Sequence, residues 1–373
     1  MNVVWVCPKK FLDWSYLNRI PVAKPHMPNS DDTYKYMKQI DATKIYTNFG
    51  PLVLELEARI AQHLDVDPNL VASVSNATSG ISGLIATAFH DSNVIACPSW
   101  TFTATPAAIL AAGKKINFSD VSQETWEAPY QPNVAAIHVF PFGSTGHTNF
   151  GDSGLNEKII IDAAASFGQV QNLNTPKKGT WAVVISMHAT KIFGSGEGGF
   201  VFSNDKEWVA SFKRWTNFGF WGSRISHFAG TNSKLSEYHA AVGLASFDKW
   251  QETANKYRSL TLKCKQISDS YDYQVHPAMA HNEISPYWIL RLPSPRHKQL
   301  MEKFLTDDKI EFRDWWGAGS HTMPAYLNAS ASSSLTNTEY LAQVTIGLPF
   351  FIGLGNSQLS RIKRVFEQVH NEC

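Results

Sequence analysis

Hydrophobic residues follow two different spacings along the chain, and segments with one spacing alternate with segments with the other. Short apolar runs, which predict strands, occur at 71–75, 94–97, 116–118, 135–140, 158–162, 182–186 and 200–202. Between several of them the apolar residues return every three or four positions, as on one face of an amphipathic helix. Strands that are regularly separated by helices predict an α/β fold, with a mostly parallel central sheet covered by helices on both faces.

Turn residues and helix breakers predict where some of these helices begin and end. Pro51 is expected at the first position of a helix whose apolar face carries Leu52, Leu56, Ile60 and Leu64. The polar turn 76–80 leads into a second helix, which presents Ile81, Leu84, Ile85 and Phe89. A third helix runs from Ala104 to Ala112 and is ended by Gly113.

The composition changes near residue 250, and this change predicts two domains. Residues 1–250 contain the alternating pattern and are expected to form the larger domain. Residues 251–373 are more polar and are expected to form a smaller α+β domain, with a polar loop at 328–334. This domain closes with an amphipathic helix whose apolar face carries Leu359, Ile362, Val365 and Phe366.

Charge and hydropathy exclude several classes of partner. Lys and Arg number 33 against 32 for Asp and Glu, so the formal net charge is +1, and the cations are not gathered in runs. Nucleic acids and anionic membranes select basic clusters, so neither is an expected partner. The apolar stretches are shorter than the roughly 20 residues that cross a bilayer. Hydrophobic residues make up 43% of the chain, which is enough to form a large core.

The cysteines and the N-terminus favour a cytoplasmic protein. Four single cysteines fit neither a disulfide framework nor a zinc site, so no metal is expected; they are Cys7, Cys97, Cys264 and Cys373. The first ten residues place their apolar stretch before their charges, and a signal peptide has the opposite order.

The residues with candidate chemistry lie between positions 159 and 204. An apolar strand ends at Asp162, and Lys191 follows 29 positions later at the exit of another strand. A glycine-rich turn at 194–199 comes directly after this lysine. In parallel sheets ligands bind at the carboxyl ends of the strands, so Asp162 and Lys191 are candidates for one functional site.

Three interpretations of Lys191 are open from these residues. It can be a solvated lysine beside a flexible loop, part of a phosphate-binding loop, or a lysine that forms a Schiff base with a carbonyl cofactor. The order argues against a phosphate loop, because the lysine precedes the glycines. A Schiff-base lysine also needs a carboxylate and an anion site. The strand at 71–75, its turn at 76–78 and the helix N-terminus that follows offer an anion site.

Together these segments resemble the DegT/DnrJ/StrS family of sugar-nucleotide aminotransferases, which use pyridoxal phosphate on the fold-type-I scaffold. Seven stretches match in the family's order: 46–53 (YTNFGPLV), 75–78 (SNAT), 98–105 (PSWTFTAT), 162–164 (DAA), 186–191 (SMHATK), 196–199 (GEGG) and 230–237 (GTNSKLSE). The resemblance covers about residues 20 to 250. It implies a homodimer with active sites at the subunit interface, glutamate as amino donor and a keto-sugar nucleotide as acceptor.

The resemblance implies three residues that take part in the chemistry. Lys191 would bind the cofactor covalently and then move a proton between the substrate and the cofactor. Asp162 would pair with the pyridinium nitrogen and keep the cofactor ring an electron sink. His188 would lie near the reacting carbon, where it would transfer protons or orient the substrate; a purely structural histidine is the alternative.

The same resemblance implies a phosphate site made by Ala77, Thr78 and Ser186. Asn232 would reach the phosphate from the neighbouring subunit. A strand-end serine is the alternative for Ser186, and for Asn232 the alternative is an N-cap of a helix at 234–244.

Phe102 would stack on the cofactor ring, with Trp100 as a second candidate and core packing as the alternative for Phe102. The sequence departs from the family at Ala165, where a Gln or His often contacts the phenolic oxygen of the cofactor. Ser166 or a water molecule is the candidate replacement. Lys191 itself argues against the family's sugar dehydratases, which carry His at this position.

Within the family, segments 21–25, 313–316 and 321–324 are most similar to enzymes that act on dTDP-4-keto-6-deoxyglucose. These enzymes form dTDP-4-amino-4,6-dideoxyglucose for surface polysaccharides such as the lipopolysaccharide O-antigen. The likeness implies substrate contacts from Asn48, Trp315, Trp316 and His321, while core packing is the alternative for the two tryptophans. A 3-aminotransferase, a dehydratase and a non-catalytic nucleotide-sugar sensor stay open as other functions.

Overall fold

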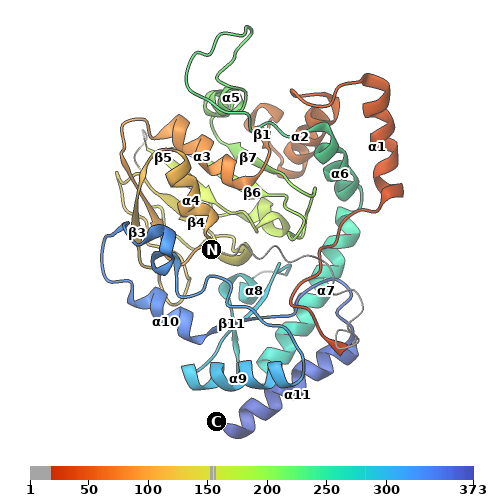
Figure 1. Cartoon of the computed structure of the whole chain (residues 1–373), viewed down its shortest axis with the longest axis vertical. Helices are drawn as coiled ribbons and strands as arrows, with labels where there is room; N and C mark the ends of the chain where they lie inside the picture. Colours follow the sequence, from red (N-terminus) through yellow and green to blue (C-terminus); the bar gives the residue numbers. More distant parts are fainter. Residues whose placement is uncertain (1–17, 152–153, 155–156, 282) are drawn as a thin grey trace, which may run out of the picture.

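The computed structural model describes residues 18–151, 154, 157–281 and 283–373. Cys7 and the first ten residues, on which part of the prediction of compartment rests, lie outside these residues. The chain forms a region around a large sheet, at the top of Figure 1, and a C-terminal region around a small sheet below it.

The large region is built on a mixed sheet that is parallel except at one strand. Its strand order is β1-β7-β6-β5-β4, at Val71–Val74, Gly199–Ser203, Thr180–Ser186, Lys158–Asp162 and Ile137–Val139. A parallel bridge between Ala96 and Ala136 continues it into a ladder of β2 (Val94–Pro98), β3 (Lys115–Ser119) and β10 (Ser330–Ala331). Among the described strands of this sheet, β7 alone runs antiparallel to its neighbours. The predicted α/β fold with a mostly parallel sheet is confirmed.

Alternate residues of the central strands face two different layers of helices. Ile159 and Ile161 of β5 pack into the layer that contains α2 (Pro51–Leu64) and α6 (Glu237–Asp248), with α1 (Ser30–Thr43) against α6. Ile160 faces the opposite layer, which is formed by α3 (Ala77–Ala88), α4 (Ala104–Ala111) and α5 (Lys206–Trp215). Because both faces are covered, β5 is apolar at consecutive positions.

The ends of the helices follow their capping residues. Pro51 occupies the first turn of α2, as predicted. However, α3 begins at Ala77 and not near Ile81, because the Asn76 side chain accepts a hydrogen bond from the N–H of Ser79 at 2.8 Å. The polar loop predicted at 328–334 is wrong in part, since Ser330–Ala331 pairs with β3 as strand β10.

The C-terminal region has its own sheet of order β11-β9-β8, at Thr345–Leu348, Trp288–Arg291 and Gln274–Val275. Its helices are α7 (Trp250–Asp269), α8 (Pro277–His281), α9 (Pro295–Asp307), α10 (Thr336–Val344) and α11 (Asn356–Glu372). The predicted apolar face of α11 is buried. One segment returns to the large sheet, where the Ser320 N–H donates to the carbonyl of Ser99 at 2.8 Å.

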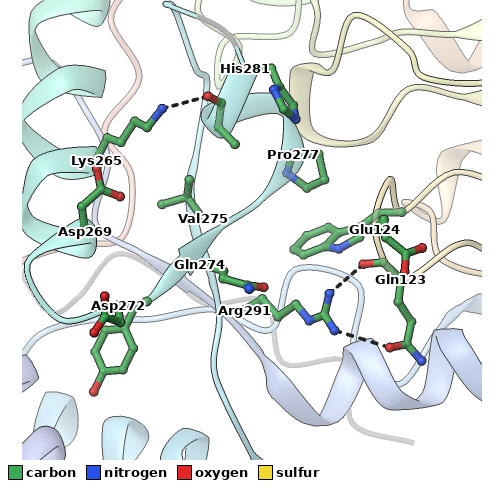
Figure 2. A pocket seen from close by; sticks show the side chains of 13 residues that line it. Gln123, Glu124, Lys265, Asp269, Asp272, Gln274, Val275, Pro277, His281 and Arg291 are labelled. Atoms are coloured by element: carbon green, nitrogen blue, oxygen red, sulfur yellow. Dashed lines mark hydrogen bonds between the residues drawn. The ribbon is translucent and has the colours of Figure 1, made fainter.

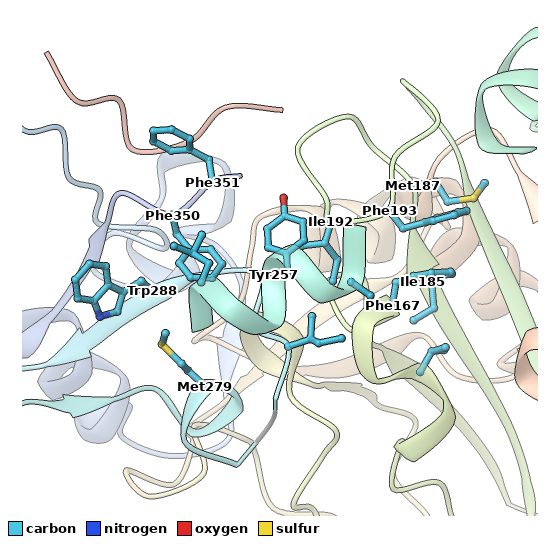
Figure 3. Close-up of a cluster of buried hydrophobic side chains, with 14 of the residues drawn as sticks. Phe167, Ile185, Met187, Ile192, Phe193, Tyr257, Met279, Trp288, Phe350 and Phe351 are labelled. Carbon is cyan, nitrogen blue, oxygen red and sulfur yellow. The ribbon is translucent and has the colours of Figure 1, made fainter. Parts of the chain in front are cut away.

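A continuous hydrophobic cluster joins the two regions (Figure 3). Phe167 and Phe193 of the large region stack with ring centroids 4.0 Å apart. Tyr257, Trp288 and Phe350 enter the same cluster from the C-terminal region. The shared core holds residues at the junction of the two regions in a fixed relation. No helix within the described ranges is long and apolar enough to cross a membrane.

Candidate active site

The carboxyl ends of β1, β2, β5 and β6 lie along one edge of the large sheet, and the candidate residues gather there. Asp162 is the last residue of β5, and Ser186 is the last residue of β6. Helix α3 begins three residues after β1 ends. The site therefore lies where ligands bind in parallel α/β sheets.

The N-terminus of α3 forms an anion cradle. Asn76 caps the Ser79 N–H, which leaves the N–H groups of Ala77 and Thr78 at the first helical positions without an intrahelical acceptor. Gly199 lies opposite Ser186 in the β6–β7 ladder. A Cβ atom at this position would lie 3.0 Å from the Ala77 nitrogen, so glycine keeps the space beside this N–H group open. Free N–H groups and the helix dipole at this place favour a bound phosphate.

Asp162 is a buried carboxylate, with 7% of its surface exposed. The Thr105 hydroxyl donates to Oδ2 at 2.6 Å, and the Ala164 N–H donates to Oδ1 at 3.1 Å. Burial raises the pKa of Asp162, and these hydrogen bonds and the charge of Lys191 oppose that rise. A buried carboxylate with two neutral donors is well placed to accept a cationic N–H group, which would offset its desolvation.

Lys191 lies in the tight connection between β6 and β7. The Met187 N–H donates to the carbonyl of Gly198 at 2.9 Å, so the connection folds back on itself. Gly196 and Gly198 have φ angles of +87° and +154°, which side chains rarely allow, and this explains the glycine-rich turn. The Lys191 side chain is half-buried, and its Nζ donates to the Tyr287 hydroxyl at 3.1 Å.

The structure separates the two candidates for an aromatic ring against the cofactor. Phe102 is 58% exposed beside the end of β2. Trp100 is 3% exposed and packs edge-on against Trp126 and Trp316. Phe102 is therefore the ring that is free to meet a ligand.

His188 is half-buried three residues before Lys191. Its Nδ1 lies 2.8 Å from the Thr190 hydroxyl, and its Nε2 lies 3.6 Å from a carboxylate oxygen of Glu197. These contacts fix the ring beside the β6–β7 connection, next to the lysine.

Asn48 and Asn232 are both exposed. The backbone of Asn48 is in the left-handed region at φ +63°. The Oδ1 atom of Asn232 accepts from the Lys234 Nζ at 2.8 Å. Asn232 does not cap the following helix, because α6 begins at Glu237 and its N-cap is Ser236.

The C-terminal candidates lie in three different environments. Trp316 is 6% exposed and stacks on Phe142 at 3.8 Å, so its burial favours the core role. Trp315 is half-buried, with its ring 4.8 Å from that of Tyr287. His321 is tied through Nδ1 to the Ser99 hydroxyl at 2.6 Å, at the carboxyl end of β2.

Three residues of this neighbourhood carry no prediction from the sequence. Thr105 bonds Asp162 from the first turn of α4, and the only signal was its place in the matching stretch 98–105. Tyr287 bonds Lys191 across 96 residues, so no local pattern indicates it. Glu237 is fully buried and accepts from the N–H groups of Leu52 and Val53, at 2.9 Å each.

Replacing Glu237 with alanine is expected to destabilise the fold and to loosen the turn 46–50 that contains Asn48. The variant leaves two buried N–H groups at the start of α2 without acceptors, at a cost of about 3 kcal/mol in the free energy of unfolding. Urea unfolding measures this loss. Glu252→Ala, which removes an exposed ion pair on α7, is the control and should stay within about 0.5 kcal/mol. Equal stability of the two variants would contradict the stabilising role of the hydrogen bonds that Glu237 accepts from Leu52 and Val53.

A separate cavity of about 450 Å³ lies between the C-terminal region and residues 123–126 (Figure 2). Arg291 there donates to the Gln123 carbonyl at 2.9 Å, and Lys265 donates to the Ala280 carbonyl at 2.8 Å. Neither Asp162 nor Lys191 lines this cavity, so it is distinct from the edge of the sheet described above.

The profile of the DegT/DnrJ/EryC1/StrS aminotransferase family matches residues 29–138 and 153–369, and the chain therefore belongs to this family. A dTDP-4-amino-4,6-dideoxy-D-glucose transaminase of Shigella dysenteriae is 25% identical over 93% of this chain and 98% of its own. A GDP-perosamine synthase of Escherichia coli O157:H7 is 24% identical over 95% and 99%. The crystal structure of DesI with its TDP-sugar product has a TM-score of 0.81 and 26% identity, over 95% of this chain and 93% of that one.

The chain is thus a pyridoxal-phosphate-dependent sugar aminotransferase of fold type I. The geometry of the site fits this cofactor. The cradle of α3, which a Cβ at position 199 would fill, suits a phosphate, and the buried Asp162 carboxylate suits a pyridinium nitrogen.

Proposed function

We propose that this enzyme transfers an amino group from glutamate to dTDP-4-keto-6-deoxyglucose and so forms dTDP-4-amino-4,6-dideoxyglucose. The observation that carries the chemistry is the Lys191 amine and the Asp162 carboxylate at the ends of adjacent strands, beside the α3 cradle. The nucleotide and the sugar are supported by the names of the Shigella relative and of the DesI structure. The single cysteines, of which Cys97 and Cys264 are buried as free thiols, support a reaction in the cytoplasm.

In this proposal the residues of the site hold the cofactor and move protons. Ala77, Thr78 and Ser186 hold the phosphate, and Asp162 holds the ring nitrogen in its protonated form. Phe102 covers one face of the ring. The bound cofactor supplies an aldehyde and an electron-withdrawing ring. Lys191 would hold the cofactor by a covalent bond and would then move the proton between the substrate carbon and the cofactor carbon, while His188 would transfer protons or orient the substrate.

Substrate contacts in the proposal come from Asn48, Trp315 and His321, which are accessible at least in part. Trp316 is less accessible to a substrate, because its ring is buried against Phe142. The exposed Arg313 lies over the Trp315 ring at 4.8 Å and is a candidate for the diphosphate of the nucleotide.

A homodimer is the second part of the proposal. Residues 217–231 extend from α5 as a long loop at the top of Figure 1. Four of their large apolar side chains are exposed, namely Phe218, Trp221, Ile225 and Phe228. An exposed apolar segment of this kind fits a second copy of the chain, and Asn232 directly after it would then reach the partner's phosphate site.

The proposed substrate is tested by incubating the purified holoenzyme with glutamate and a panel of dTDP-, UDP- and GDP-linked 3-keto and 4-keto sugars. We expect amino-sugar formation from the dTDP-linked 4-keto-6-deoxy sugar, with NMR showing nitrogen on carbon 4. Nitrogen on carbon 3 would identify a 3-aminotransferase, and loss of a hydroxyl without amination would identify a dehydratase. Tight binding without any product would indicate a nucleotide-sugar sensor.

A further inference from the structure

Tyr287 meets Lys191 from the opposite side of the junction between the two regions. It immediately precedes β9 in the C-terminal region, and its hydroxyl is the acceptor for the Lys191 Nζ at 3.1 Å. The Nζ atom also lies 5.8 Å from the centre of the Tyr287 ring. Among the described residues no other side chain accepts a hydrogen bond from this amine.

The backbone and the ring of Tyr287 are both held in place. Its carbonyl accepts from the Ser285 hydroxyl at 2.7 Å and lies 3.0 Å from the Nε2 atom of His276. Its ring lies between Trp315 and Phe142, with centroids 4.8 Å and 5.7 Å away. Phe142 adopts φ +53°, a conformation that bulky residues avoid. Backbone strain of this kind is commonest at functional sites.

The same neighbourhood lacks a polar group at position 165. A Cβ atom at Gly143 would lie 3.2 Å from the Ala165 carbonyl oxygen and 2.6 Å from the Pro286 ring, so only glycine lets 286–287 approach residue 165. Ser166 is not a replacement, because its buried hydroxyl donates to the Ser144 carbonyl at 2.8 Å. The hydroxyl of Tyr287, by contrast, lies beside the Lys191 amine and is available for a contact to the cofactor.

A phenolic hydroxyl donates one hydrogen bond and can accept one at the same time. The Tyr287 oxygen accepts from Lys191, and within the described residues its own proton has no acceptor. In pyridoxal phosphate the phenolic oxygen is attached to the ring carbon next to the one that bears the aldehyde. A hydroxyl beside the lysine nitrogen therefore lies where it can donate to that oxygen.

We propose that Tyr287 is a positioning residue of this active site, which orients the Lys191 amine and donates a hydrogen bond to the phenolic oxygen of the cofactor. This inference goes beyond the proposed sugar substrate and does not depend on it. It assigns to a residue of the C-terminal region the polar contact that the side chain of Ala165 does not make.

The test is a pH titration of the visible absorbance of the holoenzyme, without any sugar or glutamate. In Tyr287→Phe the ring is kept, and the hydroxyl is lost both as the acceptor for Lys191 and as the proposed donor to the cofactor. A hydrogen-bond donor to the phenolic oxygen stabilises the negative charge of this oxygen. It therefore favours loss of the proton from the Lys191 nitrogen that is bound to the cofactor, which is the proton that the titration follows. We therefore expect the midpoint of the titration to rise by about one pH unit, a tenfold shift in the protonation equilibrium.

Two further variants make the result specific. Tyr271→Phe removes a tyrosine hydroxyl that donates to Glu367 at 3.0 Å in the C-terminal region, and its midpoint should equal that of the wild type. In Tyr287→Phe combined with Ala165→Gln, an amide donor enters from the other side of Gly143, and the midpoint should return towards the wild-type value. An unchanged or lowered midpoint in Tyr287→Phe, or one that stays raised in the double variant, overturns the inference. Because no substrate is present, these outcomes are independent of which sugar the enzyme aminates.

Discussion

Replacing Lys191 with alanine is expected to remove the covalent link to the cofactor and to lower turnover by about four powers of ten. This is the upper end of what a positioned proton-transfer group contributes, and the lysine is proposed to form the link as well. The measurements are the visible spectrum of the purified variant and the rate of amino-sugar formation. Added methylamine should restore part of the activity, since it replaces the missing amine. Lys177→Ala is the control, because Lys177 is exposed and lies outside the site, and its activity should not change.

The same variant tests the proposed homodimer. If Asn232 serves the partner's site, a mixed dimer of Lys191→Ala and Asn232→Ala subunits contains one site with both residues intact. We expect Asn232→Ala to be inactive because it loses a contact to the phosphate. Refolding the two variants together should then recover about a quarter of wild-type activity, because half of the dimers are mixed and each has one intact site. No recovery, with mixed dimers demonstrated by mass, would contradict the sharing of Asn232 between subunits.

Replacing Asp162 with asparagine is expected to lower turnover by about three powers of ten while leaving the cofactor-free fold at least as stable. Two opposite unit charges about 4 Å apart attract by about 4 kcal/mol at an effective dielectric constant of 20, and an amide in place of the carboxylate would supply none of this attraction to a pyridinium nitrogen. Steady-state rates measure the first effect.

Stability separates this role from a structural one. Burial raises the pKa of Asp162 above its unfolded value, so the folded cofactor-free protein binds this proton more tightly than the unfolded chain. The carboxylate therefore contributes stability when protonated, and this contribution is lost as the pH rises through the raised pKa. At neutral pH the thermal midpoint of cofactor-free Asp162→Asn should match or exceed that of the wild type. A large drop would indicate that Asp162 serves the core and not the cofactor.

The class of the fold could be predicted because its signals are local. The consecutive isoleucines of β5 are apolar since both faces of a parallel strand are covered, and Pro51 marks its helix by its fixed φ angle. The glycines after Lys191 follow from positive φ angles, which the turn imposes on its own backbone. The first residue of α3 was harder to predict, because the start of this helix depends on the side-chain cap of Asn76 and not on an apolar residue.

The candidate site divides in the same way. Asp162, Ser186 and the turn at Ala77 and Thr78 could be selected from the sequence, since each lies at or within a few residues of the end of a strand and strand ends meet at one edge of the sheet. The pair of tryptophans could not be told apart from the sequence. Burial decided between them, because Trp316 stacks on Phe142 whereas Trp315 faces Tyr287.

The sequence by itself determined the family, the cofactor chemistry and the strand-end residues. These depend on short motifs, each of which can be recognised within its own stretch of the chain. Only the tertiary structure brought Tyr287 to Lys191, Glu237 to the start of α2 and Ser320 to Ser99. Each of these contacts joins segments separated by more than 90 residues. The contacts of Tyr287 and Ser320 are decided by how the two regions pack on each other, and the contact of Glu237 by how α6 packs on α2 within the large region. Periodicity carries no information about that packing.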